Sequence, residues 1–379
     1  MTERLYYKDA YMTEFTAQVL SCEPSEHSWA VVLDKTAFYP EGGGQPCDLG
    51  TLGGAAVTDV HIRDGVIVHT CDRPVSGEVC GSINWARRFD LMQQHSGEHL
   101  VSGLIHDRFG YENVGFHMGA DRITIDLSGL LNAQELAEIE LAANQAVWDD
   151  IPAEIFYPDA ETLKKLAYRS KKELSGEVRI VRWGGIDTCA CCGTHVASSG
   201  EIGLIKLLSC VKFRDGVRIE LVCGRRAYDY VSAAVSQNRE ISGLLSAKPL
   251  ETAAAVRRMA EELAETRFAL GAVQQRYFEI LAERVCGEDD LLLFEDGLQP
   301  DALRRLCVLL MEHSGRRCAV FSGTDAEGYK YAVGQTDGDL RQFVKDMNAA
   351  LHGRGGGKPF FAQGSVAASR AEITDFFRI

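Results

Sequence analysis

Residues 87–109 read RRFDLMQQHSGEHLVSGLIHDRF, and this stretch predicts a helix that carries His95 and His99. Side chains four residues apart project from the same face of a helix, so both imidazoles can bind one metal ion. Histidines with this spacing also occur by chance on protein surfaces and in cores. The pair therefore needs further ligands before it indicates a metal site.

A second pair with the same separation lies further along the chain. Cys191 and His195 belong to the segment CACCGTH at residues 189–195, which predicts a loop rather than a helix. Thiolate and imidazole ligands favour zinc over magnesium or calcium. We expect one zinc ion with these ligands: His95, His99, Cys191 and His195. The neighbours Cys189 and Cys192 leave the identity of the thiolate ligand open.

Two other interpretations of these residues remain open. His95 to His99 reads His-Ser-Gly-Glu-His, which matches the H-x-x-E-H pattern of a class of metalloproteases in which Glu98 would activate water. Such proteases usually complete the site with a carboxylate, whereas the partners here are a thiolate and an imidazole. Four protein ligands would also suit a closed structural zinc site in an RNA-binding module.

The residues before the predicted helix indicate a small β-barrel or sandwich. Short strand-like runs at 29–33, 56–62 and 66–69 are separated by glycine and proline. Between the first runs, residues 39–46 read YPEGGGQP, which predicts a loop whose backbone can approach a ligand closely. A merely flexible turn is the alternative for this loop.

The middle of the chain predicts an α+β fold. Helices are expected at 132–148 and 161–166, strands at 122–127 and 154–157, and a hairpin at 211–221.

From about residue 226 the composition changes to helix formers. Apolar residues alternate at spacings of three and four, which predicts a heptad seam in a helical spacer. The seam consists of Val256, Met259, Leu263, Thr266, Leu270, Val273, Tyr277 and Ile280. It is typical of a coiled coil between two chains or of a helical hairpin within one chain.

The C-terminal part predicts a compact α/β domain. Strands at 291–294 and 318–322 alternate with helices at 300–314 and 337–351. We expect an α+β protein with four parts, of which the first is barrel-like, the second binds zinc, the third is helical and the fourth is α/β. Their boundaries are 1–88, 89–228, 229–286 and 287–379.

The charge balance limits how the chain can contact a nucleic acid. Its 379 residues carry a formal net charge of −14, which argues against binding through global positive charge. Any RNA contact must use local basic clusters, although exposed, solvated charge is the alternative for each cluster. The clusters are Lys164, Lys165, Arg169, Lys171 and Lys172, and then Lys206, Lys212, Arg214, Arg218, Arg225 and Arg226.

The sequence also predicts a cellular location. Its first 15 residues lack the apolar run of a secretory signal, and no stretch of 18 apolar residues suits a membrane span. Twelve scattered cysteines in a chain of this length are typical of reduced thiols. We expect a cytoplasmic protein without a membrane partner.

Several motifs in the same order resemble the alanyl-tRNA editing family, which includes the editing domain of alanyl-tRNA synthetase and the free-standing AlaX-type proteins. The loop at 39–46, the stretch at 84–95, and the segments at 115–119 and 124–127 are similar to family motifs, as is the C-x-x-x-H at 191–195.

The C-terminal part carries a further resemblance. Residues 352–359, followed by 362–364, resemble the glycine-rich segment of the synthetase's C-terminal domain. This segment is not a P-loop, because Pro359 stands where a P-loop needs serine or threonine. The order of parts is similar to the long free-standing form, and nothing like an aminoacylation domain precedes them.

The resemblance implies a zinc-dependent deacylase that removes serine or glycine from mischarged alanine tRNA. A synthetase pocket shaped for alanine cannot readily exclude smaller glycine or nearly isosteric serine, so a second hydrolytic site is useful. Zinc can activate water, or it can act as Lewis acid and template, and four bound protein ligands favour the template role. The preference between serine and glycine stays open.

The resemblance also assigns roles to residues. Gln45 is a candidate catalytic residue on this ground. Glu98 is a second candidate, as a base, on its chemistry alone, because the sequence departs from many relatives at this position, and a solvent-facing carboxylate is the alternative. Candidate substrate-binding residues are Gly42, Gly43, Gly44, Gln45, His117, Gly355, Gly356, Gly357 and Lys358. Structural hydrogen bonding is the alternative for His117. We expect tRNA as partner, and a homodimer through the helical spacer and the C-terminal domain.

Overall fold

A computed structural model of the chain describes residues 2–170, 177–284 and 290–378. Residue contacts divide the chain into two units, Met1–Arg239 and Glu240–Ile379, and each is described by itself. The finer division into four parts stays a prediction. Lys171, Lys172 and the predicted boundary at residues 286 and 287 lie outside the described residues.

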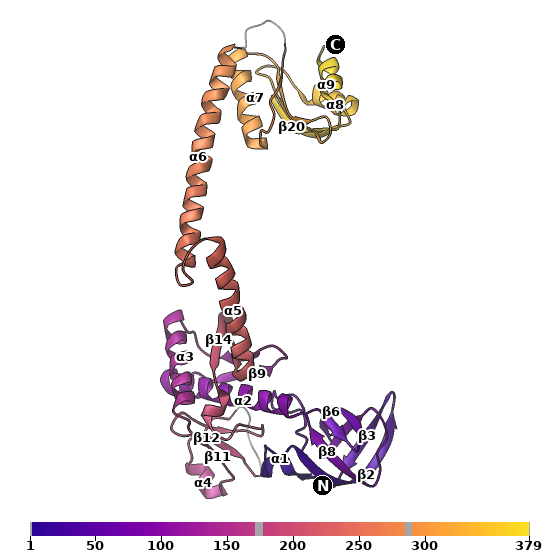
Figure 1. Cartoon of the computed structure of the whole chain (residues 1–379), viewed down its shortest axis with the longest axis vertical. Coiled ribbons are helices and arrows are strands. Elements are labelled where there is room, and N and C mark those ends of the chain that lie inside the picture. The colour runs from indigo at the N-terminus through magenta and orange to yellow at the C-terminus, as the bar shows by residue number, and fades with distance from the viewer. Residues whose placement is uncertain (1, 171–176, 285–289, 379) are drawn as a thin grey trace. The chain divides into compact units, whose positions relative to one another are not determined.

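The first unit begins with a closed barrel of antiparallel strands (Figure 1). In barrel order the strands are β2 (Glu14–Ser25), β3 (Ser28–Leu33), β7 (Val66–Cys71), β6 (Ala55–Arg63), β5 (Gly50–Leu52) and β8 (Glu78–Ile83). Buried side chains such as Val31, Leu33 and Val60 fill its core. Beside it, β1 (Glu3–Arg4) pairs in parallel with β4 (Lys35–Thr36), and α1 (Leu5–Lys8) follows β1.

Helix α2 (Trp85–Phe109) leaves the barrel and carries the first histidine pair. It begins where the Asn84 side chain accepts a hydrogen bond from the backbone N–H of Arg87, and it ends at Gly110 in the left-handed region. The sequence predicted residues 87–109. Despite its polar sequence the helix is buried continuously from Leu91 to Val101.

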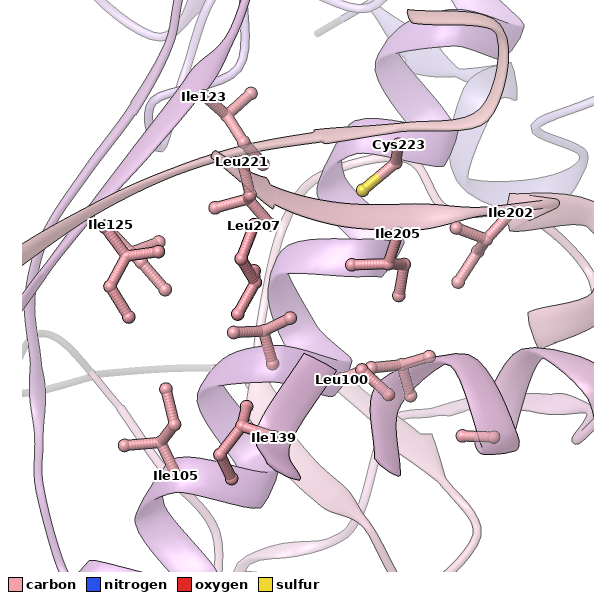
Figure 2. Close-up of a cluster of buried hydrophobic side chains, with 14 of the residues drawn as sticks. Leu100, Ile105, Ile123, Ile125, Ile139, Ile202, Ile205, Leu207, Leu221 and Cys223 are labelled. Carbon is pink, nitrogen blue, oxygen red and sulfur yellow. The ribbon is translucent and has the colours of Figure 1, made fainter. Parts of the chain in front are cut away.

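A sheet covers α2 and completes the main core. Its strand order is β14 (Ile205–Phe213), β15 (Gly216–Cys223), β10 (Ile123–Leu127) and β9 (Asn113–Met118), with antiparallel neighbours. Figure 2 shows how Ile125 and Leu207 of the sheet point toward Leu100 and Ile105 of α2 and Ile139 of helix α3 (Ala133–Trp148). This packing fixes the position of α2 against the sheet and α3.

A smaller sheet places the second ligand pair. It consists of β11 (Ala153–Phe156), β12 (Ile180–Trp183) and β13 (Asp187–Ala190), and α4 (Ala160–Lys165) and the short 3-10 helix η1 (Ser199–Ile202) lie near it in sequence. Gly103 of α2 makes the close approach of β13 possible. A Cβ atom at Gly103 would lie 2.7 Å from the Asp187 Cβ atom and 2.7 Å from the Ile186 carbonyl oxygen. Helix α5 (Gly224–Leu244) follows β15.

The second unit contains the long helix α6 (Thr252–Arg284) and a mixed sheet (Figure 1). The sheet order is β16 (Leu291–Phe294), β17 (Cys318–Thr324), β18 (Gly328–Gly334), β20 (Phe361–Val366) and β19 (Arg354–Lys358). The helices are α7 (Pro300–Ser314), α8 (Arg341–Ala350) and α9 (Arg370–Phe377). Phe278 of α6 packs into the core formed with α7. The predicted α+β class is confirmed.

The predicted heptad seam lies on an exposed face of α6. Its apolar side chains are between 43% exposed, at Val256, and 65% exposed, at Val273. Within the described residues, no helix has the length and apolar character that crossing a membrane requires.

Candidate metal centre

The four residues predicted as metal ligands lie together in the first unit. His95 and His99 come from consecutive turns of α2, and Cys191 and His195 come from the loop after β13. One potential ligand atom from each residue lies within 4.8 Å of those of the other three. Cys191 Sγ is 3.4 Å from His95 Nε2 and 3.3 Å from His195 Nε2. These donors fit zinc, which takes thiolate and imidazole ligands in a tetrahedral arrangement.

The Nδ1 atom of each imidazole has a hydrogen-bond partner outside the four-residue group. Nδ1 of His95 lies 2.8 Å from Gln45 Oε1, Nδ1 of His99 lies 2.8 Å from Asp187 Oδ2, and Nδ1 of His195 lies 3.1 Å from Ser96 Oγ. Such outer partners fix the tautomer and orientation of a metal-binding histidine. They leave the three Nε2 atoms to share one centre.

The electrostatics of the cluster favour a thiolate at Cys191. Burial alone would raise the pKa of the Cys191 thiol, but the imidazoles of His95, His195 and His99 outweigh it and hold this pKa well below its usual range. Burial lowers the pKa of His195 to about 3, so this imidazole is neutral. Burial also opposes protonation of His99, but Cys191 and Asp187 raise its pKa to about 10. The thiolate is the form of cysteine that binds metals.

The neighbouring cysteines are placed differently from Cys191. Cys189 is buried, and it lies close to His99 and Asp187 in a second group of potential ligands. Cys192 is exposed at the wall of the adjoining cavity. Neither belongs to the four-residue group, so the geometry favours Cys191 as the thiolate ligand.

Glu98 is buried, and the interpretation of its carboxylate as solvent-facing is wrong. The residue is 2% exposed because α2 is covered on this face as well. Its Oε1 atom accepts hydrogen bonds from Ser102 Oγ at 2.7 Å and from Asn113 Nδ2. It lies on the wall of the same cavity as His95 and His99.

A cavity of about 620 Å³ opens onto the cluster. Gly43 and Gly44 of the glycine loop line it, with φ angles of 62° and 89° that favour glycine. Gly42 and Gln45 of the same loop are not among its lining residues. Gln45 is fully buried, and its side chain contacts His95 and the loop after β13.

His117 lies apart from this cavity. It is exposed on β9, and its neighbour Phe116 lines the cavity and stacks on His95. Successive side chains of a strand point to opposite faces, so His117 faces away from the metal ligands.

The glycine-rich segment of the second unit forms an exposed strand. Gly355, Gly356, Gly357 and Lys358 belong to β19, which pairs with β20 at the edge of the sheet. Residues of β19 line two pockets, one of which also includes Arg304 and the other Lys345.

Carboxylates neutralise much of the positive charge that the sequence offered for RNA contact. Lys206 pairs with Glu140 at 2.6 Å, Arg218 with Asp126 at 2.6 Å, Arg225 with Asp229 at 2.9 Å, and Arg226 with Asp90 at 2.6 Å. Arg169 is not a surface cation, because its Nε atom donates to Asp187 Oδ1 at 2.8 Å and its side chain is 9% exposed.

A buried ion pair joins the glycine loop to α2. Arg88 is fully buried and donates through Nε to both carboxylate oxygens of Asp48, at 2.8 and 2.9 Å. Asp48 follows the loop and also accepts from the backbone N–H of Tyr39. The guanidinium further donates to the carbonyl oxygens of Ala10 and Ala37. The pair therefore fixes the loop relative to the helix that carries the histidines.

Sequence reasoning missed the partners behind the ligands. Asp187 lies 88 residues from His99, and Ser96 and Asn113 carry no motif, so spacing gave no signal for them. The place of Gln45 in the glycine loop predicts a catalytic or substrate-binding role, but it does not predict the contact with His95.

Changing Asp187 to asparagine is expected to weaken zinc binding about 10- to 100-fold, as is typical for such partners. The amide keeps the size of the side chain but removes the negative charge shared by His99 and Arg169. Competition with a chelator measures the affinity. Glu154→Gln, at an exposed carboxylate on β11, is the control, and equal affinities for the two variants would contradict this role.

Comparison with known proteins agrees with the arrangement of these parts. Residues 3–87 match the family model described as tRNA synthetases class II (A). Residues 178–220 match the threonyl and alanyl tRNA synthetase second additional domain, and residues 280–378 match the DHHA1 domain.

One relative matches from end to end. The alanyl-tRNA editing protein AlaX-L of Pyrococcus horikoshii is 28% identical, over 99% of this chain and 97% of the relative. Over nearly its whole length the chain is thus similar to an AlaX-L-type alanyl-tRNA editing protein.

Other relatives match over only part of their own length. The alanine–tRNA ligase of Pyrobaculum neutrophilum is 34% identical over the full chain, which spans 44% of that ligase. The alanyl-tRNA editing protein Aarsd1-B of Xenopus laevis is 33% identical over 66% of this chain and 65% of the relative. The chain thus spans less than half of the ligase.

Proposed function

We propose that the chain is a zinc-dependent deacylase that hydrolyses alanine tRNA mischarged with serine or glycine. The observation that carries the proposal is the group of His95, His99, Cys191 and His195, of which all but His195 line a cavity. The end-to-end similarity to a protein named as an alanyl-tRNA editing protein supports the substrate class.

The chemistry needed is hydrolysis of an activated ester at the terminal ribose. Zinc, when bound by the four residues, would supply a Lewis acid that orients the substrate. Gly43 and Gly44 line the cavity, and we infer that their backbone amides donate to the adenosine or to the developing oxyanion. Serine and glycine are the expected errors, because the alanine-binding pocket of a synthetase excludes neither amino acid strongly. Their esters on alanine tRNA are therefore the substrates that need hydrolysis.

Glu98 is the proposed general base of this site. Ser102 and Asn113 hold its carboxylate on the cavity wall, one helical turn from His95. Glu98→Gln retains an oxygen for both hydrogen bonds but cannot take a proton.

We expect Glu98→Gln to lower the rate of deacylation by about 100- to 10,000-fold, the usual range for a lost general base. Zinc content should stay unchanged, because Glu98 is outside the four-ligand group. Single-turnover rates on seryl-tRNA measure the effect, and a rate within twofold of the natural protein would remove Glu98 from the mechanism.

The deciding experiment is deacylation of seryl- and glycyl-tRNA charged on alanine tRNA, with alanyl-tRNA as the control. The zinc-loaded protein should release serine or glycine and spare alanine, and a chelator should stop the reaction. Well-folded, zinc-loaded protein that hydrolyses neither mischarged substrate would overturn the proposal. Peptide cleavage under the same conditions would favour the metalloprotease interpretation instead.

We propose the exposed strand β19 as a tRNA contact in the second unit. Its residues Arg354–Lys358 are exposed, and cationic side chains stand at both ends of the three glycines. Exposed glycine backbone allows close approach of a phosphate, and flanking cations add attraction.

We also propose that α6 pairs with α6 of a second copy of the chain. The seam continues over four heptads of a 33-residue helix, and its apolar side chains are exposed. Glu262 borders this seam. It would face Arg267 of the second copy in a parallel pair and Arg276 of the second copy in an antiparallel pair, so charge complementarity holds in both directions.

Leu270→Glu is expected to convert the dimer to a monomer, because a buried, unpaired carboxylate in the seam is costly. Light scattering after gel filtration measures the mass, which should fall to the 41.6 kDa of one chain. Phe268→Glu is the control, since Phe268 is 82% exposed and lies outside the seam. A natural protein that is monomeric at tens of micromolar would contradict the pairing.

A further inference from the structure

The side chain of Gln45 connects the two segments that carry the ligands. Its Oε1 atom lies 2.8 Å from His95 Nδ1 on α2 and 3.1 Å from the backbone nitrogen of Thr194, which follows Cys191 in the ligand loop. Its Nε2 atom donates to Thr194 Oγ1 at 2.8 Å. The residue is fully buried, so solvent does not compete for these bonds.

The contacts fix which end of the amide faces His95. The backbone N–H of Thr194 can only donate, so the amide atom that it contacts must be the carbonyl oxygen. The same oxygen faces His95 Nδ1, and an oxygen acceptor requires a hydrogen on that nitrogen. His95 is therefore held as the tautomer whose Nε2 lone pair faces Cys191 Sγ.

The space around this contact is filled. A Cβ atom at Gly193 would lie 2.3 Å from His95 Nδ1 and 2.8 Å from Gln45 Oε1. Only glycine at this position allows the ligand loop to close over the hydrogen bond. The pair His95–Gln45 thus has little freedom to separate while the loop is in place.

The backbone of Gln45 belongs to the glycine loop. Gly42 and Gln45 exchange backbone hydrogen bonds of 3.1 and 3.0 Å, which close the turn that presents Gly43 and Gly44 to the cavity. The residue whose side chain contacts His95 therefore also closes this turn through its backbone. Gln45 thus contacts the ligand His95 and is itself part of the glycine loop.

We propose that Gln45 is a positioning residue that couples the metal ligand His95 to the glycine loop. Its carbonyl oxygen fixes the donor atom of His95, and a metal ion on His95 in turn holds the loop where its amides face the cavity. Gln45 acts through His95 and does not contact substrate, which replaces the substrate-binding and catalytic roles expected from the sequence. The proposal rests on the proposed function only for the identity of the metal.

Gln45→Met tests the coupling, because methionine fills a similar volume but offers His95 no comparable acceptor. We expect zinc affinity, measured by chelator competition without RNA, to fall about 10- to 100-fold. Hydrogen exchange of the amides at residues 43–45 gives a second readout. Zinc should slow this exchange in the natural protein and leave it unchanged in Gln45→Met.

Two further variants separate the coupling from a general loss of structure. Gln45→Glu keeps an acceptor oxygen for His95 and should restore most of the zinc affinity. Tyr39→Phe removes the hydrogen bond from the Tyr39 hydroxyl to the Gly42 carbonyl at 3.2 Å, so it loosens the loop without touching His95. Because Tyr39→Phe keeps every contact of Gln45, zinc should still slow exchange at residues 43–45, and the zinc affinity of this variant should fall less than that of Gln45→Met.

Gln45→Met with unchanged zinc affinity, or with loop exchange that still responds to zinc, would overturn the proposal. If Gln45→Met does not fold, Thr194→Val decides instead, because it removes only the partner of the Gln45 amide nitrogen. It should weaken zinc binding and the response of the loop, and the absence of both effects would equally overturn the coupling. These measurements use no tRNA, so a failure of the editing proposal leaves their outcome intact.

Discussion

Replacing Cys191 with serine is expected to remove bound zinc and to lower seryl-tRNA deacylation by more than about 100-fold, beyond the usual effect of an outer partner. The thiol is the one soft donor in the four-residue group, and its Sγ atom lies within 3.4 Å of the Nε2 atoms of two histidines. A serine hydroxyl is a poor zinc ligand in this setting, because zinc sites in proteins use thiolate, imidazole and carboxylate donors.

Cys189→Ser and Cys192→Ser are the matched controls within the same segment. Both should retain one zinc ion per chain and most of the activity, because neither sulfur belongs to the four-residue group. Zinc content is measured by atomic emission and activity by single-turnover deacylation. Loss of zinc in Cys189→Ser with retention in Cys191→Ser would exchange their roles. Unfolding of Cys191→Ser together with its loss of zinc would support a structural site.

Arg88→Ala is expected to lower the free energy of unfolding of the first unit by about 3–5 kcal/mol, the usual cost of breaking a buried ion pair. Asp48 is 1% exposed and would be left without its guanidinium partner. The carbonyl oxygens of Ala10 and Ala37 would lose their donors at the same time.

Urea unfolding followed by tryptophan fluorescence measures this change. The four tryptophans are residues 29, 85, 148 and 183, so the signal reports on the first unit. Arg73→Ala is the control, because Arg73 pairs with Asp72 on the barrel surface and its loss should leave the midpoint unchanged. If the urea midpoint of Arg88→Ala equals that of Arg73→Ala, the buried ion pair is not needed for stability. The glycine loop should also lose its fixed position when Arg88 is absent.

The elements with clear periodicity could be predicted from the sequence, and those without it could not. Helix α2 was expected at 87–109 and spans Trp85–Phe109, because its start and end have local signals. Strand β19 escaped prediction, since RGGGK has neither alternation nor strand propensity. Its glycines are explained by the neighbouring strand, because a Cβ atom at Gly357 would lie 2.0 Å from the Phe361 carbonyl oxygen.

The residues of the site likewise divide into those that the sequence could predict and those that it could not. Ligand spacing predicted the residues that the structure brings together at the metal centre. The burial of Glu98 could not be foreseen, because α2 looks polar and is enclosed by elements distant in sequence. The glycine loop drew attention to Gln45, but the contacts of Asp187 and Gln45 with the histidines form only through tertiary packing, so no local pattern predicts them.

The internal pairing of the basic side chains also bears on how ionic strength affects binding. A protein cation that neutralises an RNA phosphate releases condensed counterions, and each such contact steepens the fall of affinity with salt. Lys206, Arg218 and Arg226 already hold carboxylates, so each must give up an existing partner before it can displace counterions. Affinity for an RNA would then depend less on salt than the count of 40 lysines and arginines suggests.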